Sequence, residues 1–327
     1  MKRVARILII VLFATIICAG GIFYWAYQGF HNPGPLETTS RLVIPKGTSL
    51  NRIAALLLKA GIIARPEIFI WGTRLSGEGR TINAGEYDFQ AAMSPRQVLT
   101  TLTSGKIVLR RVTIPEGLSS FEIAALLNQT PALHGTIASS TEGSLLPETY
   151  SYAFDDTRSE LMRRMNAAMR DTLRSLWEGR APDLPFDTPE QALILASIVE
   201  KETGIGVERP RVAAVFINRL RKKMRLQSDP TVVYGITLGE HPLGRALTRR
   251  DLETDTPYNT YRIAALPPGA ICNPGKGAIA AVLNPLVSDE FYFVADGTGG
   301  HVFAKTLAEH NRNVARWRRL QKKKKKR

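Results

Sequence analysis

The chain has 327 residues, 44% of them hydrophobic, and is therefore long enough to form more than one domain with a buried core. Much of its formal net charge of +15 lies at the two ends, in the basic residues at positions 2, 3 and 6 and in the run 322–327, which leaves +6 for the body of the chain. So mild a charge does not indicate nucleic-acid binding, and the terminal run is typical of a disordered, solvated tail that contacts anionic lipid. The lone Cys272 beyond the apolar N-terminal segment excludes an internal disulfide or thiolate zinc site there, and the histidines show no metal-ligand spacing.

The N-terminal segment predicts a membrane anchor. Residues 7–27 contain no charged side chain and are long enough to cross the hydrocarbon core of a bilayer, and three aromatic residues lie near their end. A cleaved signal peptide usually has a shorter apolar region, so we expect the anchor to be retained. The basic residues before it place the N-terminus in the cytoplasm and the rest of the chain across the membrane. We assign 1–30 to the cytoplasmic start and transmembrane anchor, and 31–40 to a linker.

An internal repeat follows the linker. Residues 42–57 and 112–127 align without gaps and match at nine of sixteen positions. Each copy predicts a strand, a Pro-x-Gly turn, a Ser N-cap and an amphipathic helix. The first copy continues into a second helix near 66–74 and a returning strand at 85–89. Residues 41–109 resemble the LysM-like modules associated with peptidoglycan binding, and both carbohydrate contact and a purely scaffolding role remain open.

The helix predicted at 188–203 carries the strongest chemical signal. It follows a long amphipathic helix at about 156–178, and Thr188 begins it with a capping box and a proline at the first helical position. The run 192–199 has no charge on any face, so the helix is buried on most sides and delivers Glu200 from apolar surroundings. Burial raises the pKa of a carboxyl and can make it a general acid. The alternative is that Glu200 belongs to the solvated last turn of an ordinary core helix.

Two polar segments downstream are candidates for binding a ligand rich in hydroxyls. The first is 226–234, whose Ser, Asp and Pro are also explained by turn formation alone. The second is 256–261, where two tyrosines flank Asn259 in the manner of a sugar-binding wall. A helix at 210–224 precedes these segments. After them we expect a buried strand at 290–295, a neighbouring strand at 300–303 and a terminal helix.

Several long motifs occur in a fixed order: EGSLLPETY, LASIVEKET, VFINRLRKKMRLQSDPTVVYG, TPYNTYRIAALPPGAICNPG, FYFVADGTGGHVF and EHN. With them the chain resembles the YceG/MltG-like endolytic murein transglycosylases from about residue 40 to 315. The resemblance implies an α+β protein with an N-terminal transmembrane helix, a LysM-like α+β module, and a mixed α/β catalytic domain over 110–320 whose catalytic helix is buried. The basic tail 321–327 is no part of this pattern, and Glu148 stands where the motif often has Asp.

The resemblance also implies a mechanism that needs a single acid and no metal or cofactor. Glu200 would protonate the glycosidic oxygen and then deprotonate the C6 hydroxyl of the same N-acetylmuramic acid, which closes a 1,6-anhydro ring. The residues expected to bind the glycan and orient the acid are Gln227, Ser228, Asp229, Asn259 and Tyr261. The expected partners are peptidoglycan glycan strands and peptidoglycan synthases of the penicillin-binding class, with no nucleic acid, and the expected location is the bacterial inner membrane with the catalytic domain in the periplasm.

Two rival functions remain open. One is a non-catalytic peptidoglycan-binding scaffold in which Glu200 is structural. The other is a hydrolytic muramidase that uses Glu200 together with Asp229, since a hydrolase that cuts a glycosidic bond ordinarily needs two carboxylates.

Overall fold

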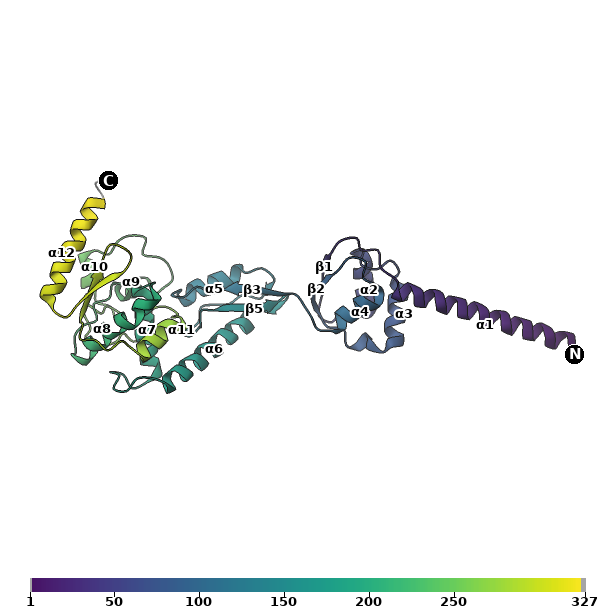
Figure 1. Ribbon diagram of the computed structural model, residues 1–327, viewed down its shortest axis with the longest axis horizontal. Helices are drawn as coiled ribbons and strands as arrows, with labels where there is room; N and C mark the ends of the chain where they lie inside the picture. The colour runs from purple at the N-terminus through teal and green to yellow at the C-terminus, as the bar shows by residue number, and fades with distance from the viewer. Residues whose placement is uncertain (1, 325–327) are drawn as a thin grey trace. The chain divides into compact units, whose positions relative to one another are not determined.

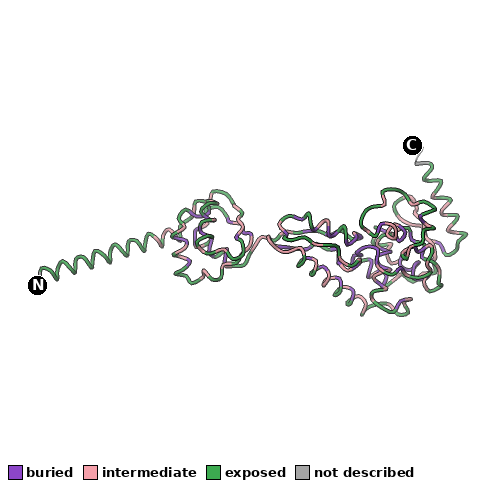
Figure 2. Tube along the Cα trace, turned by 180° about the vertical axis from the view of Figure 1, so that it is seen from behind, coloured by how far each residue is buried: buried purple, intermediate pink, exposed green. Residues whose placement is uncertain are grey.

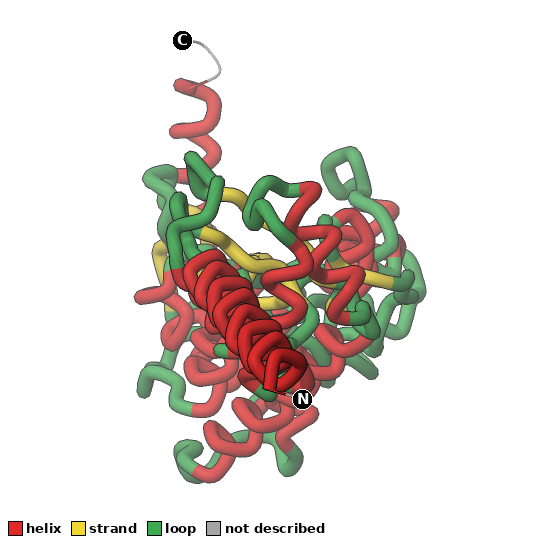
Figure 3. Tube along the Cα trace, turned by 90° about the vertical axis from the view of Figure 1, so that its right-hand side faces the viewer, coloured by secondary structure: helices red, strands yellow, loops and turns green. Residues whose placement is uncertain are grey.

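The computed structural model describes residues 2–324 and divides into two compact units. The first consists of Met1–Arg110 with Ser151–Asp155, and the second of Arg111–Tyr150 with Asp156–Arg327. Helices predominate, as Figure 3 shows. The strands of the described residues pair into four two-stranded sheets. This mixed content of helices and strands agrees with the predicted fold class.

The first helix, α1 (Lys2–His31), is a single uninterrupted helix of 30 residues. Residues 3–25 of this helix are all exposed, and the trace is coloured accordingly in Figure 2. By length and composition it is able to cross a membrane. The predicted apolar N-terminal helix is therefore present, and it extends four residues beyond the predicted apolar run, from Gln28 to His31.

The first unit has the predicted strand, helix, helix, strand order. Its elements are β1 (Ser40–Ile44), α2 (Leu50–Lys59), α3 (Pro66–Ser76), the 3-10 turn Glu78–Arg80, β2 (Gly85–Phe89) and α4 (Pro95–Thr103). The two strands pair antiparallel, with Ser40 opposite Phe89 and Ile44 opposite Gly85. Phe69 and Tyr87 are fully buried between this ribbon and the helices.

The predicted repeat is confirmed at the level of local structure. Its second copy forms β3 (Leu109–Thr113) and α5 (Ser120–Gln129), and β3 pairs with β5 (Thr149–Ala153). Ser49 and Ser119 cap the two equivalent helices through their side chains. Each Pro-x-Gly turn ends on a glycine with positive φ, 76° at Gly47 and 79° at Gly117, a conformation that favours glycine.

The second unit is built around a buried helix. Its remaining elements are β4 (Leu133–His134), β6 (Asp156–Thr157), α6 (Arg158–Glu178), α7 (Pro189–Glu202), the 3-10 turn Gly206–Glu208, α8 (Arg209–Arg221), α9 (Asp229–Thr237), α10 (Arg249–Glu253), α11 (Lys276–Leu283), β7 (Tyr292–Ala295), β8 (His301–Ala304) and α12 (Leu307–Lys324). Helix α7 packs against α6, α8 and α11 (Figure 1). Its residues Leu195–Val199 are all buried, as the absence of charge in this run predicts.

Three details differ from the predictions. Residues 229–234 are not an irregular turn but the start of α9, because Pro230 occupies its first turn and Thr231 and Val232 are buried. Strand β7 is half-buried along its length rather than buried, since its sheet has two strands and α12 packs against it. The predicted disorder of 322–324 is wrong because these residues continue α12, as lysine readily does. The rest of the predicted tail, 325–327, lies outside the described residues.

Candidate active site

The end of α7 presents two glutamates with different surroundings. Glu200 and Glu202 are two residues apart, so their side chains point about 200° apart around the helix axis. The helix begins as predicted, with a complete capping box between Thr188 and Gln191, and it ends at Thr203, whose backbone is extended. Each carboxylate therefore has to be considered with the elements that pack on its own side.

Glu200 belongs to a buried ion-pair network. Its side chain is 5% exposed, and Oε1 accepts a hydrogen bond of 2.8 Å from Nη2 of Arg209. Oε2 accepts one of 2.9 Å from the backbone N–H of Gly275. The same Arg209 nitrogen contacts Glu116 at 2.7 Å. Burial raises the pKa of Glu200, while the Gly275 N–H and the Arg209 charge oppose that rise.

The backbone is packed tightly around this network. A Cβ on Gly275 would lie 1.8 Å from Oε1 of Glu116, and one on Gly277 would lie 2.6 Å from Nη1 of Arg209. Next to Glu200, Nζ of Lys201 donates to the carbonyl of Gly117 at 3.2 Å. The turn of the second repeat copy, the start of α8 and the N-terminal end of α11 with its cap Gly275 thus enclose Glu200. Arg209 and Gly275 engage its two oxygens.

Glu202 lies in a different environment, with a hydroxyl as its hydrogen-bond partner. Oγ of Ser228 donates to its Oε1 at 2.5 Å. Burial raises the pKa of Glu202 to about 6, an effect that the Ser228 bond opposes and that the nearby Asp229 charge reinforces. Interactions with His301 and Arg219 act on this pKa in the opposite, lowering direction. A carboxyl with this pKa is partly protonated near neutral pH and can both donate and accept a proton.

Most of the residues predicted to bind the glycan lie on the Glu202 side. Asp229 is exposed and accepts a hydrogen bond of 2.6 Å from the hydroxyl of Tyr261. Ser228 is 1% exposed and its hydroxyl bonds Glu202. Gln227 is exposed, has a φ of 53°, and receives a 3.4 Å contact from Nη1 of Arg219. The prediction grouped these residues with Glu200, whereas the structure brings Ser228 to Glu202.

Asn259 holds the backbone of its own loop. It is fully buried, and its side-chain nitrogen donates to the carbonyls of Leu252 and Thr254 at 3.0 and 2.6 Å. Its side-chain oxygen accepts from the N–H of Tyr261 at 3.0 Å. The other tyrosine of the predicted wall, Tyr258, packs edge-on against another ring of the unit, with 4.8 Å between centroids. Of the two tyrosines in the predicted sugar-binding wall, Tyr261 is the one whose hydroxyl contacts an exposed carboxylate, that of Asp229.

A cavity of about 440 Å³ adjoins this group. Asp229 and Lys201 line it together with residues of α9, the loop after α9 and the second repeat copy, including Tyr234, His241, Gly117 and Ser119. The cavity is therefore polar on the side where the exposed carboxylate of Asp229 lies.

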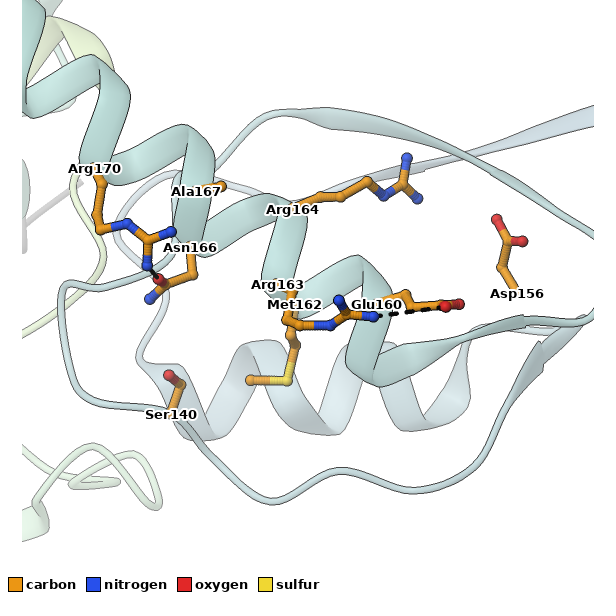
Figure 4. Close-up of a pocket in the computed structure, with 9 residues that line it drawn as sticks. All are labelled: Ser140, Asp156, Glu160, Met162, Arg163, Arg164, Asn166, Ala167 and Arg170. Atoms are coloured by element: carbon orange, nitrogen blue, oxygen red, sulfur yellow. Dashed lines mark hydrogen bonds and ion pairs between the residues drawn. The ribbon is translucent and has the colours of Figure 1, made fainter.

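A larger cavity, about 940 Å³, lies along α6 and is unrelated to these residues. Figure 4 shows its lining, in which Glu160 and Arg163 are 3.6 Å apart and Arg170 donates to Asn166. It contains none of the predicted site residues, so size alone does not locate the candidate site. Within the described residues, no cluster of three or more His, Cys, Asp or Glu has the arrangement of a metal site.

Five residues of the site were not identified from the sequence: Glu116, Glu202, Arg209, Arg219 and His301. Arg219 is 8% exposed and donates to the carbonyls of Phe291 and Leu226 at 2.7 and 2.6 Å. His301 Nδ1 lies 2.8 Å from a carboxylate oxygen of Glu208. Glu116 had one visible signal, because the equivalent residue of the first repeat copy is the exposed Lys46.

Comparison with known proteins identifies the family. The sequence model of the YceG-like family matches residues 42–316. The chain belongs to the YceG-like family. The endolytic murein transglycosylase of Bacillus subtilis is 31% identical over 84% of this chain and 84% of its own length. The protein of the same name from Streptococcus pneumoniae is 30% identical over 95% of this chain and 65% of its own length. A crystal structure of a putative YceG-like protein from Listeria monocytogenes matches with a TM-score of 0.50 and 31% identity, over 84% of this chain and 99% of that one.

Proposed function

We propose that this YceG-like chain is a membrane-anchored, endolytic lytic transglycosylase of peptidoglycan. It cleaves the β-1,4 bond between N-acetylmuramic acid and N-acetylglucosamine within glycan strands and leaves 1,6-anhydro ends. Two curated relatives that carry the name endolytic murein transglycosylase support the activity. The observation that carries the proposal is the carboxyl of Glu202 at the end of α7, which is hydrogen-bonded to Ser228 beside the exposed Asp229. Its burial, which raises the pKa to about 6, is consistent with the role of an acid.

The family resemblance assigned the acid to Glu200, but the surroundings favour Glu202. Both oxygens of Glu200 are engaged, one by the guanidinium of Arg209 and the other by the N–H of Gly275. Burial raises the pKa of both glutamates, but a general acid needs a proton to give, and a carboxyl whose two oxygens accept from a guanidinium and a backbone N–H has neither oxygen free to offer one. Glu202 has Ser228 as its hydrogen-bond partner and the Asp229 charge nearby. We therefore assign the catalytic acid to Glu202, and to Glu200 the role of holding the end of α7 in place.

The chemistry then runs through one carboxyl. Protonated Glu202 gives its proton to the glycosidic oxygen, the bond from that oxygen to C1 of N-acetylmuramic acid breaks, and the N-acetylglucosamine hydroxyl leaves. The resulting carboxylate accepts the proton of the C6 hydroxyl, and O6 bonds to C1 to close the anhydro ring. No water is consumed. The Ser228 hydroxyl stabilises the carboxylate between the two proton transfers, because it donates to Oε1.

One observation favours a second candidate, a hydrolytic muramidase. The carboxylate of Asp229 is exposed and close enough to Glu202 to raise its pKa. Two carboxyl groups on either side of a glycosidic bond are the arrangement of a hydrolase, in which the second group activates water or attacks C1. In this candidate Asp229 works with Glu202 rather than with Glu200.

The anchor gives the proposal a location. With α1 across the bacterial inner membrane and its basic end in the cytoplasm, the second unit acts in the periplasm on strands near the membrane. Nascent glycan and the synthases that make it occur there, so cleavage would terminate strand elongation. The first unit, as a LysM-like module, would bind the same glycan.

Muropeptide analysis by mass spectrometry tests the proposal. Full-length protein is incubated with nascent, uncrosslinked peptidoglycan, and the wild type is compared with Glu202→Gln and Glu200→Gln. We expect 1,6-anhydro ends from the wild type, none from Glu202→Gln, and residual anhydro ends from folded Glu200→Gln. The reverse pattern would return the acid to Glu200. Reducing ends would establish the muramidase, and no cleavage by folded wild type would leave a binding scaffold.

A further inference from the structure

The end of α1 is packed into the first unit as one of its helices. Phe30 is 7% exposed, and a Cβ on Gly72 of α3 would lie 2.4 Å from its ring. In the other direction, a Cβ on Gly29 would lie 2.6 Å from Ile68. Glycine on each helix thus permits a close approach, and α1 also contacts α4. The anchor is therefore joined rigidly to this unit rather than through a flexible linker.

The length of α1 determines where its contact with α3 lies relative to the bilayer surface. About 20 helical residues, at 1.5 Å each, cross a hydrocarbon core of about 30 Å. A span that starts at Ile7, just after the last basic residue, ends near Ala26. Tyr24, Trp25 and Tyr27 lie there, where aromatic residues are enriched in membrane proteins. The contact with α3 through Gly29 and the next residues is thus within one turn of the bilayer surface.

Helix α3 exposes large apolar side chains at this level. Trp71 is 64% exposed and Leu75, one turn later, is 75% exposed. Both line a cleft of about 320 Å³ whose opposite side is formed by Phe23 and Tyr27 of α1. Because Phe23 lies inside the predicted span, the cleft begins at the depth of the lipid chains and continues outward along α3.

A cation–π contact supports the same placement. The guanidinium of Arg65, at the start of α3, lies 4.7 Å from the ring centroid of Trp25 in the anchor. Arginine and tryptophan together are suited to the head-group layer, where one contacts phosphate and the other the upper part of the acyl chains. Arg96 of α4 lines the edge of the same cleft.

We propose that α3 lies in the interfacial layer of the bilayer, with Trp71 and Leu75 in contact with lipid. The occupant of the cleft is the lipid around α1, and the first unit is held against the membrane surface in one orientation. This inference rests on the anchor of the proposed function and is independent of the assignment of the catalytic acid.

Spin-label accessibility in vesicles tests the inference. Full-length protein with Cys18→Ala is reconstituted into phosphatidylethanolamine and phosphatidylglycerol vesicles, and a nitroxide is attached to Leu75→Cys. Phe13→Cys reports the anchor, and Lys106→Cys, an exposed position in the loop that leads out of the unit, is the matched aqueous control. Cys272 is buried, and a sample without an added cysteine measures its labelling. Leu75 is mostly exposed, so its replacement removes little packing.

We expect the label at 75 to be several-fold less accessible to an aqueous nickel chelate than the label at 106, and more accessible to oxygen. The inference would be overturned, with the anchor left intact, if the label at 13 is shielded from nickel but the label at 75 is as accessible to nickel as the label at 106. Access of nickel to position 13 would show that α1 does not cross the bilayer, and both the anchor and the inference would fail. Neither result would bear on muropeptide products.

Discussion

Replacement of Glu202 by glutamine should stabilise the protein at neutral pH while it removes activity. Burial raises the pKa of this carboxyl from 4.5 to about 6. Each pKa unit corresponds to about 1.4 kcal/mol, so the ionised side chain destabilises the native state by about 2 kcal/mol above pH 7. Between pH 4.5 and 6 the folded protein binds more protons than the unfolded chain, and stability therefore falls as pH rises through this range. Glutamine has no charge to bury and keeps an oxygen for Ser228.

Glu200→Gln should act in the opposite direction on stability, because although burial also raises the pKa of Glu200, the replacement leaves the largely buried Arg209 guanidinium without its charged partner on α7. It removes the negative partner of Arg209, whose side chain is 13% exposed. Removing one partner of a buried pair is destabilising, and because Glu116 remains 2.7 Å from the guanidinium we expect a loss of about 2 kcal/mol, near the value of a charged hydrogen bond. The two conservative replacements, two residues apart on one helix, therefore change stability with opposite signs.

Urea unfolding in detergent at pH 4 and pH 8 measures both effects. Trp177, which packs against the core of the second unit, serves as the fluorescent probe in a background whose other tryptophans are phenylalanine. We expect Glu202→Gln to gain about 2 kcal/mol at pH 8 and almost nothing at pH 4. A Glu202→Gln variant that is no more stable than the wild type at pH 8 would refute the claim that the cost of burying this carboxylate outweighs its favourable contacts. A Glu200→Gln variant that is fully stable yet inactive would refute the assignment of the acid to Glu202, since Glu200 would then be the acid.

Two further predictions concern the neighbours of Glu202 and the close packing of Gly275. Ser228→Ala should move the alkaline limb of the pH dependence of kcat/KM to higher pH, because the hydroxyl lowers the pKa of Glu202, the proposed acid. Asp229→Asn should move it to lower pH, because the negative charge of Asp229 raises that pKa. The rate of anhydro-product formation across pH measures both shifts, and shifts in the same direction would contradict the assignment. Gly275→Ala should lower the melting temperature, because its Cβ would lie 1.8 Å from Glu116, whereas Gly206→Ala, with no atom within 4 Å of its Cβ, should leave it nearly unchanged. Equal melting temperatures would show that the loop relaxes without loss.

Local sequence signals predicted the elements of the fold well. The capping box at Thr188, the proline after it and the uncharged run to Val199 define α7 from neighbouring residues alone, and the structure has this helix at Pro189–Glu202. The repeat was predictable for the same reason, because its turn glycine and capping serine act within a few residues. Where the prediction failed, as at Asp229, two local signals competed: the Ser-Asp-Pro run is a good turn and an equally good first turn of a helix.

The roles of the two glutamates could not be predicted because their partners are remote in sequence. Gly275, which donates to Glu200, lies 75 residues away, and Ser228, which donates to Glu202, lies 26 residues away. Nothing within the motif LASIVEKET distinguishes an ion-paired carboxylate from one that a hydroxyl contacts. The helical angle of about 200° places the two glutamates on different sides of α7. It could not show on which side Ser228 and Asp229 would lie.

The arrangement at the end of α7 accounts for the presence of both acids. A carboxyl whose pKa is held near 6 must be buried without a cation bonded to it. Its ionised form therefore destabilises the folded state at the helix end that carries it. Glu200 offsets this, because its bonds to Arg209 and Gly275 tie the same helix end to α8 and to the N-terminal end of α11. Loss of the Glu200–Arg209 pair is expected to destabilise the folded state by about 2 kcal/mol, which is similar to the free-energy cost of burying the ionised Glu202. A stabilising replacement at 202 should therefore restore the stability that Glu200→Gln removes, but it cannot restore activity if Glu202 is the group that transfers the proton.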